Sequence, residues 1–203
     1  MNDKWGIVDV QDVCDGAIYC VEQGWVDGNA LCIDGGSAGG YTTLAALTFE
    51  NTFKVGASLY GISDLSALAA ETHKFESRYC DMLIGDHYKE RSPIHYCDKL
   101  DCPVLLLQGL EDKVVPPNQA EIMYEALTAK GISTALVLYE GEQHGFRISQ
   151  NVRHALHSEY FFFCQVLGYE MQPEDGICNI KFGRNVVSNN TTETQIEDSD
   201  DQK

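Results

Sequence analysis

Short apolar runs alternate with amphipathic stretches along most of the chain. Apolar runs bounded by turn residues predict strands, and we expect four of them, over residues 30–33, 55–59, 103–108 and 135–139. The third run is apolar at four consecutive positions, residues 104–107, which is typical of a strand buried on both faces of a parallel sheet. Four strands are few for a stable open sheet.

Around these runs, apolar residues recur every three or four positions, which predicts helices over residues 10–24, 41–47, 119–130 and 148–167. The last of these helices has apolar residues at spacings of 4, 4, 4, 3 and 4, which predicts one broad apolar face. The residues of that face are Ile148, Val152, Leu156, Tyr160, Phe163 and Leu167.

Strands and helices in strict alternation predict an α/β fold with a doubly wound, mostly parallel sheet. The length of 203 residues fits one domain, which we assign to residues 1–184. From residue 185 the composition shifts to Ser, Asn, Thr, Gln and Asp, and the last fifteen residues contain five acids and one lysine. We therefore expect residues 185–203 to form a disordered acidic tail.

The charge of the chain narrows the choice of partners. Thirty-one acidic residues against 14 basic ones give a formal net charge of −17, which repels phosphate backbones and anionic lipid surfaces. We therefore expect no nucleic-acid partner. No run approaches the roughly 18 apolar residues of a membrane span, so we expect no membrane partner either.

The cysteines bear on the compartment in which the chain works. None of the eight forms a Cys-x-x-Cys pair, and most lie inside apolar runs, which favours buried reduced thiols over a disulfide framework. The first residues lack the apolar stretch of a secretory signal. We therefore expect a cytoplasmic protein. No phosphate loop, dinucleotide fingerprint or metal-ligand cluster is visible, so no cofactor is expected.

Residues 35–40 read Gly-Gly-Ser-Ala-Gly-Gly, directly after the first predicted strand and at the start of a helix. This is the context of the Gly-x-Ser-x-Gly nucleophile elbow, in which small neighbours let the chain turn sharply and expose the serine hydroxyl. Ser37 is then the candidate nucleophile, and the backbone N–H of Ala38 is a candidate oxyanion donor. A glycine-rich turn that binds phosphate, or that only packs tightly, is the alternative.

Two later loops supply partners for such a serine. In an α/β-hydrolase the acid follows a late strand and the histidine follows the last one, in the chain order Ser, Asp, His. Here Asp112 follows the third strand and His144 follows the fourth. His144 would take the proton of Ser37 and Asp112 would orient the imidazole. Glu111 is the alternative candidate for the acid of the triad.

The other histidines lack a glycine-flanked position after a strand. His154 and His157 lie three residues apart on the last helix, but no Asp or Cys ligand set accompanies them. We expect them on a solvated helix surface, and we predict no metal site. The same reasoning sets aside His73, His87 and His95.

At these motifs the sequence resembles the catalytic domain of the prolyl oligopeptidase family of serine peptidases, closest to its acylaminoacyl-peptidase and dipeptidyl-peptidase-like branch. The matching stretches are residues 5–12, 35–44, 60–65, 109–116 and 142–146. The resemblance implies an α/β-hydrolase fold and hydrolysis of peptide or acyl-amide bonds of short peptides through an acyl-enzyme on Ser37. It also implies that Phe75 and Tyr79 line a pocket for a proline-like ring, although two core aromatics would give the same pattern.

The sequence departs from the family in two ways. Members usually have His-Gly where this chain has Gln108 and Gly109. The family's domain also has further N-terminal strands and a β-propeller, which this chain lacks, and those strands normally supply the second oxyanion donor. Loss of one donor costs about 100- to 1000-fold in rate. We therefore expect the C-terminal portion of a longer enzyme, either a partial gene model or a short isoform.

Three functional hypotheses remain open at this point. The first is a serine peptidase with peptide substrates, and the second is a carboxylesterase-like hydrolase, since a triad does not distinguish amides from esters. The third is a catalytically inert fragment. The nucleophile strand would lie at an edge of the sheet, so we also expect pairing with another chain, or a homo-oligomer, through this exposed edge.

Overall fold

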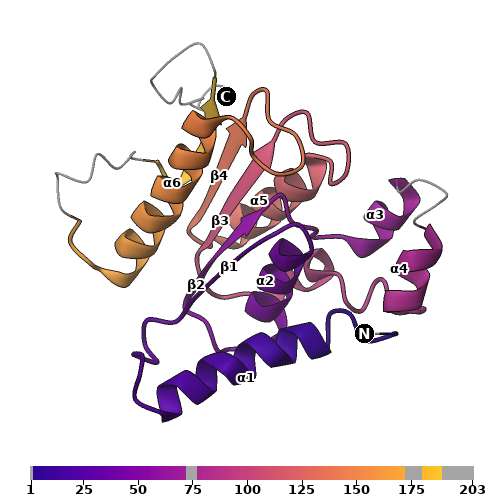
Figure 1. The fold of residues 1–203 in the computed structure, drawn as a ribbon, viewed down its shortest axis with the longest axis horizontal. Helices are drawn as coiled ribbons and strands as arrows, with labels where there is room; N and C mark the ends of the chain where they lie inside the picture. The colour runs from indigo at the N-terminus through magenta and orange to yellow at the C-terminus, as the bar shows by residue number, and fades with distance from the viewer. Residues whose placement is uncertain (1, 72–76, 172–179, 189–203) are drawn as a thin grey trace.

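Five parallel strands form one sheet, in the order in which they occur along the chain (Figure 1). The computed structural model describes residues 2–71, 77–171 and 180–188. The strands are β1 (Cys32–Gly36), β2 (Val55–Leu59), β3 (Val104–Gly109), β4 (Thr134–Tyr139) and β5 (Gly183–Val187). The predicted α/β fold with a parallel sheet is thus confirmed, and β1 lies at the edge of the sheet.

Strand β5 was not predicted, and the expected start of the tail at residue 185 falls inside it. The segment has only two apolar residues, so its pattern does not differ from that of the polar stretch that follows. It pairs with β4 through a buried polar residue, Asn185, whose side-chain amide donates to the carbonyls of Leu136, Lys181 and Gly183. Residues 189–203 lie outside the described residues.

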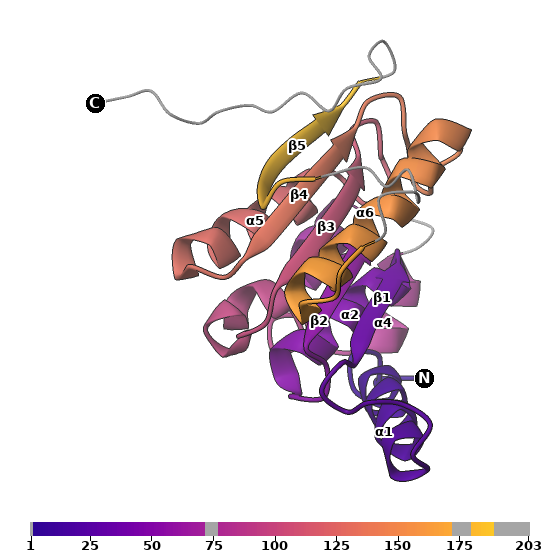
Figure 2. The ribbon, with the colours of Figure 1, turned by 90° about the vertical axis from the view of Figure 1, so that its left-hand side faces the viewer.

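One face of the sheet packs against α2 (Ala38–Phe49) and α5 (Asn118–Lys130) (Figure 2). Outside these helices lie α1 (Val8–Glu22), which packs on α2, and the 3₁₀ segment η1 (Pro93–Lys99), which packs on α2 and α5. Helix α2 is buried at every position from Gly40 to Thr48, because α1 and η1 cover the side that faces away from the sheet. The core on this face holds α2 rigidly behind β1 and β2.

The opposite face packs against α6 (Ser149–Leu167), the helix for which the sequence predicts one broad apolar face. Three residues of that face do not lie in the core: Val152, Leu156 and Tyr160 are 46%, 64% and 47% exposed. The helix instead buries five other residues, among them the small Ala155 and Ser158. The sheet already presents large side chains here, so small residues on α6 let the helix approach. The buried set is Asn151, Ala155, Ser158, Phe162 and Cys164.

Between β2 and β3 the chain forms α3 (Leu65–Glu71) and α4 (Ser77–Ile84), which lie to one side of the sheet (Figure 1). Nearby, the buried guanidinium of Arg91 donates to the carbonyls of Trp5 and Asp3, both at 3.1 Å, and ties the N-terminal segment to the domain. Among the helices of the described residues, none is long and apolar enough to cross a bilayer.

Candidate active site

The turn between β1 and α2 holds Ser37 in a backbone conformation that non-glycine residues rarely adopt. Its φ is +57°, and its N–H donates to the carbonyl of Leu59 at 2.9 Å. A residue held in such a sparsely populated backbone region costs about 1–3 kcal/mol and persists where the surroundings impose it. The geometry is that of the predicted nucleophile elbow.

Close approach of strand and helix explains why glycines flank the serine. A Cβ on Gly35 would lie 2.5 Å from the backbone of Gly39, and one on Gly40 would lie 2.7 Å from the Cα of Gly61. Backbone atoms cannot move aside as a flexible side chain can. The turn can therefore form only with glycine at both positions, and this turn brings the hydroxyl to the carboxyl end of the sheet.

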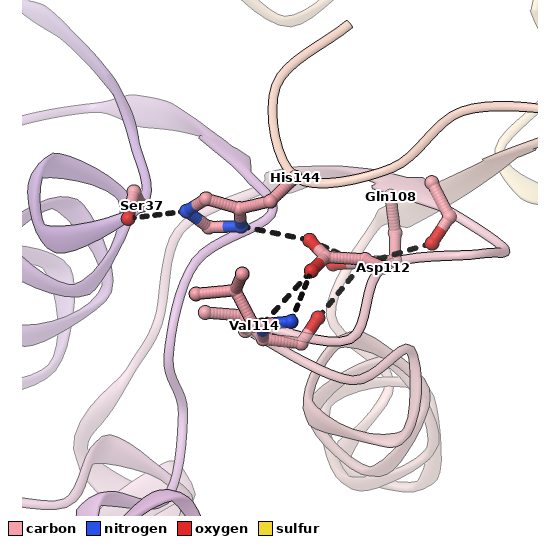
Figure 3. Close-up of polar contacts among 7 residues, drawn as sticks. Ser37, Gln108, Asp112, Val114 and His144 are labelled. Carbon is pink, nitrogen blue, oxygen red and sulfur yellow. Dashed lines mark hydrogen bonds and ion pairs between the residues drawn. The ribbon is translucent and has the colours of Figure 1, made fainter. Parts of the chain in front are cut away.

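Side chains from three strand ends form one hydrogen-bonded series (Figure 3). The Nε2 of His144 lies 2.7 Å from the Oγ of Ser37, and its Nδ1 lies 2.8 Å from the Oδ2 of Asp112. The three residues follow β1, β3 and β4, so the structure brings together the side chains that the sequence singled out. The rival acid, Glu111, is exposed and makes no such contact.

Asp112 is fully buried at its side chain, and the surrounding donors hold both of its oxygens. Its Oδ1 accepts the backbone N–H groups of Val114 and Val115 at 2.8 and 2.9 Å, while Gln108 donates weakly to Oδ2 at 3.4 Å (Figure 3). These donors fix the orientation of the carboxylate beside His144. The glutamine that departs from the family pattern is therefore part of the site, in contact with the acid.

The loop that carries His144 is anchored by a buried glutamate. The carboxylate of Glu142 accepts the backbone N–H groups of Arg147 and Ile148 at 2.8 and 2.9 Å and the side-chain amide of Asn151 at 3.1 Å. Its carbonyl accepts the N–H of Glu111 at 3.0 Å, which joins this loop to the loop of Asp112. Sequence reasoning missed Glu142, although an acid beside the histidine motif was a usable signal.

The remaining predicted site residues have different outcomes. Ala38 is exposed at the first position of α2, where its N–H has no acceptor within the helix. Phe75 lies outside the described residues, and Tyr79 lies in α4 with its side chain outside them. His154 was expected at the helix surface, but its Nδ1 lies 3.0 Å from the hydroxyl of Tyr139, and burial lowers its pKa.

Tyr60 is a further residue at this site that the sequence did not single out. It follows β2, and its ring centroid lies 5.1 Å from that of His144.

Among the described residues, no group of three or more His, Cys, Asp or Glu side chains could hold a metal ion.

Comparisons with known proteins agree with this geometry. The model of the prolyl oligopeptidase family matches residues 1–170. A curated relative, dipeptidyl peptidase family member 6 of Caenorhabditis elegans, is 31% identical over 85% of this chain and 25% of its own length. Dipeptidyl aminopeptidase BIII of Pseudoxanthomonas mexicana is 30% identical over 85% of this chain and 27% of its own length.

Solved structures match as well. A crystal structure of puromycin hydrolase superposes with a TM-score of 0.84 at 39% identity, covering 89% of this chain and 28% of that one. A puromycin-hydrolyzing peptidase of Mycobacterium tuberculosis gives a TM-score of 0.81 at 47% identity, covering 83% of this chain and 27% of that one. The chain thus spans about a quarter of the length of these relatives. It belongs to the prolyl oligopeptidase family of serine peptidases, whose α/β-hydrolase catalytic domain it matches in part.

Proposed function

We propose that this chain carries the catalytic machinery of a serine peptidase that hydrolyses peptide or acyl-amide bonds of short peptides, with Ser37 as nucleophile. The observation that supports this most directly is the series from Ser37 Oγ through both imidazole nitrogens of His144 to Asp112, with spacings of 2.7 and 2.8 Å. Both distances are within the reach needed for proton transfer between a nucleophile and its base.

In the first half-reaction, the Oγ of Ser37 attacks the carbonyl carbon of the scissile bond and its proton passes to the Nε2 of His144. The tetrahedral intermediate then collapses: the C–N bond breaks, and the imidazolium returns that proton to the leaving amine. Asp112, held by two backbone N–H groups, keeps the Nδ1–H directed toward itself and stabilises the imidazolium.

In the second half-reaction, water replaces the amine. His144 removes a proton from the water, the hydroxide attacks the acyl carbon, and the ester bond to Ser37 breaks as its oxygen regains a proton. The N–H of Ala38, at the positive end of α2, is positioned to stabilise the oxyanion in both halves.

The names of relatives support short amide substrates. They include dipeptidyl peptidases, acylamino-acid-releasing enzymes and puromycin-hydrolyzing peptidases. We propose the same class of substrate for this chain, with an aminoacyl or short peptidyl group transferred to Ser37.

The test is labelling of the purified chain with a fluorophosphonate, which reacts only with an activated serine. We expect labelling that disappears in Ser37→Ala and after heat denaturation, and that slows by about four orders of magnitude in Asp112→Asn, because the imidazole is then held in the wrong tautomer. Unlabelled native protein would overturn the proposal that this chain is active by itself.

A second assay separates the substrate classes. We expect cleavage of an aminoacyl anilide at a rate comparable with that of a short-chain ester. Turnover of the ester alone, with labelling intact, would instead identify a carboxylesterase-like hydrolase.

A further inference from the structure

Tyr60 has a backbone conformation that the triad does not explain. Among the described residues, the non-glycine residues with positive φ are Asp3, Ser37 and Tyr60, at +53°, +57° and +39°. The strand register pairs Gly36 with Leu59, so Ser37 and Tyr60 are the first residues beyond two neighbouring strands. Such outliers persist where the surroundings impose them, and they cluster at functional sites.

The backbone turn directs the Tyr60 ring onto the imidazole of His144. The two ring centroids are 5.1 Å apart, with planes inclined by 66°, which is an edge-to-face contact. On another side, the ring of Phe146 lies 5.2 Å away at 82°, and Phe146 in turn packs against Tyr139 at 4.6 Å. The Tyr60 N–H donates to the carbonyl of Leu107 at 2.7 Å. The ring is therefore fixed by its neighbours and by the sheet.

The same ring touches the nucleophile turn. A Cβ on Gly36 would lie 2.8 Å from the Tyr60 hydroxyl oxygen and 2.9 Å from a ring carbon. This glycine makes room for Tyr60, whereas Gly35 and Gly40 make room for the approach of α2. Tyr60 thus contacts the turn that carries the nucleophile and the ring that acts as its base.

A further contact that fixes the His144 ring matters most in the acyl-enzyme. In the free enzyme, Ser37 and Asp112 together define the plane of the His144 ring. Once the serine oxygen is acylated it has no proton to share, so Asp112 is the remaining hydrogen-bond partner of the triad. A single hydrogen bond leaves the imidazole free to tilt, unless another group holds its face or edge.

We propose that Tyr60 is a positioning residue that holds the imidazole of His144 in its catalytic plane through ring contact, above all in the acyl-enzyme. This inference rests on the proposed function of Ser37 and His144. Burial, together with the charges of Glu159 and Asp112, raises the pKa of Tyr60, so the phenol stays neutral while the enzyme works. The ring, and not the hydroxyl, carries the effect.

The test compares Tyr60→Leu and Tyr60→Phe with a control, Phe162→Leu, which shortens a buried aromatic on α6 away from the triad. Burst kinetics on an activated acyl ester give acylation and deacylation rates separately, at a temperature where all variants are folded. We expect Tyr60→Leu to slow deacylation about 10- to 100-fold and acylation less. We expect Tyr60→Phe and Phe162→Leu to have the acylation and deacylation rates of the wild type.

A second readout does not depend on turnover. The His144 Nδ1–H that is bonded to Asp112 should give a downfield proton signal by NMR, which we expect to broaden in Tyr60→Leu and to stay sharp in Tyr60→Phe and Phe162→Leu. A sharp signal in Tyr60→Leu, or equal loss in the Phe162 control, would overturn the inference. If the wild type shows the signal but no burst and no fluorophosphonate labelling, the proposed function fails, and the NMR comparison still decides the role of Tyr60.

Discussion

The two halves of the candidate site are supported very differently. Strands β3 and β4, which lead to Asp112 and His144, are buried at every residue and lie between other strands. Strand β1, which leads to Ser37, has one neighbouring strand and one buried residue, Ile33, among five. The candidate acid and base therefore come from the middle of the sheet, and the candidate nucleophile comes from its edge.

This difference shows what keeps each half in place. The loops of Asp112 and His144 are joined by the hydrogen bond from the Glu111 N–H to the backbone carbonyl of Glu142, and the buried carboxylate of Glu142 anchors the loop of His144. Ser37 depends on β2 and on the close approach of α2. We expect changes in the nucleophile half to displace Ser37, and changes in the other half to displace His144, each with its own cost in stability.

The largest effect on the candidate nucleophile should come from Gly35→Ala. The added Cβ would meet the backbone of Gly39 at 2.5 Å, so we expect a loss of about 3 kcal/mol in unfolding free energy and no fluorophosphonate labelling. The matched control is Gly39→Ala, where a Cβ has no neighbour within 4 Å outside its own helix. It should stabilise the fold by about 0.5–1 kcal/mol, as alanine does in a helix. Equal stability of the two variants in urea would contradict the assigned strand–helix contact.

Glu142→Ala should come next and should act on the other half. It leaves the N–H groups of Arg147 and Ile148 without their buried acceptor, which should cost about 2 kcal/mol and mobilise the loop of His144. Glu111→Ala, at an exposed acid on the adjoining loop, should stay within about 0.5 kcal/mol. Urea denaturation measures the stability of both variants. A Glu142 variant as stable as the Glu111 variant would show that Glu142 does not anchor the loop of His144.

A smaller effect should depend on pH. Burial of Glu159 on α6, with the charge of Asp34 in β1, raises the pKa of its carboxyl from 4.5 to about 7, and its Oε1 is buried without a hydrogen-bond partner in the part of the chain that the structure describes. The folded state therefore favours the protonated acid. This contribution to stability is complete below about pH 4.5 and is lost as the pH rises to about 7.

Glu159→Gln removes that titration. We expect the variant to match wild type near pH 4 and to exceed it by about 1 kcal/mol at pH 8, a value reduced by the screening of a partly exposed group. Thermal unfolding at the two pH values measures this. A difference of the same size at both would show that the carboxyl does not titrate in this range.

The smallest effect should come from Leu156→Gln, on the outward side of α6. This side chain is 64% exposed, so the change should stay within about 0.5 kcal/mol, whereas Phe162→Ala on the inward side should cost about 3–5 kcal/mol. Comparable losses of unfolding free energy in the two variants would show that the side of α6 with Leu156 is also buried.

Much of the site was predictable because its determinants are local. The glycines around Ser37 and the two loops after apolar strands carry their signal in adjacent residues, and four strands and four helices follow from periodicity. Asp112 could be preferred over Glu111 from the family resemblance, and the buried environment of Asp112 agrees with it.

The errors arose where tertiary packing overrides the local pattern. The buried side of α6 uses Ala155 and Ser158, because the sheet beneath supplies the large side chains, so the apolar face that the sequence predicts does not identify the buried side. Strand β5 is stabilised by hydrogen bonds of Asn185 to the carbonyls of Leu136 in β4 and of Lys181. The ring contact of Tyr60 with His144 joins residues that follow separate strands, and no local spacing indicates it.

The order of the strands has a consequence for biosynthesis. Strands β2 to β5 each pair with the strand made just before them, so each can join the sheet as the polypeptide leaves the ribosome. His144 is added 107 residues after Ser37, which takes roughly 5–20 s at ordinary rates of translation. During that interval the serine has no base to deprotonate it. Until then the Ser37 hydroxyl is an ordinary alcohol, and the reactivity that we propose for it begins only when synthesis has passed β4.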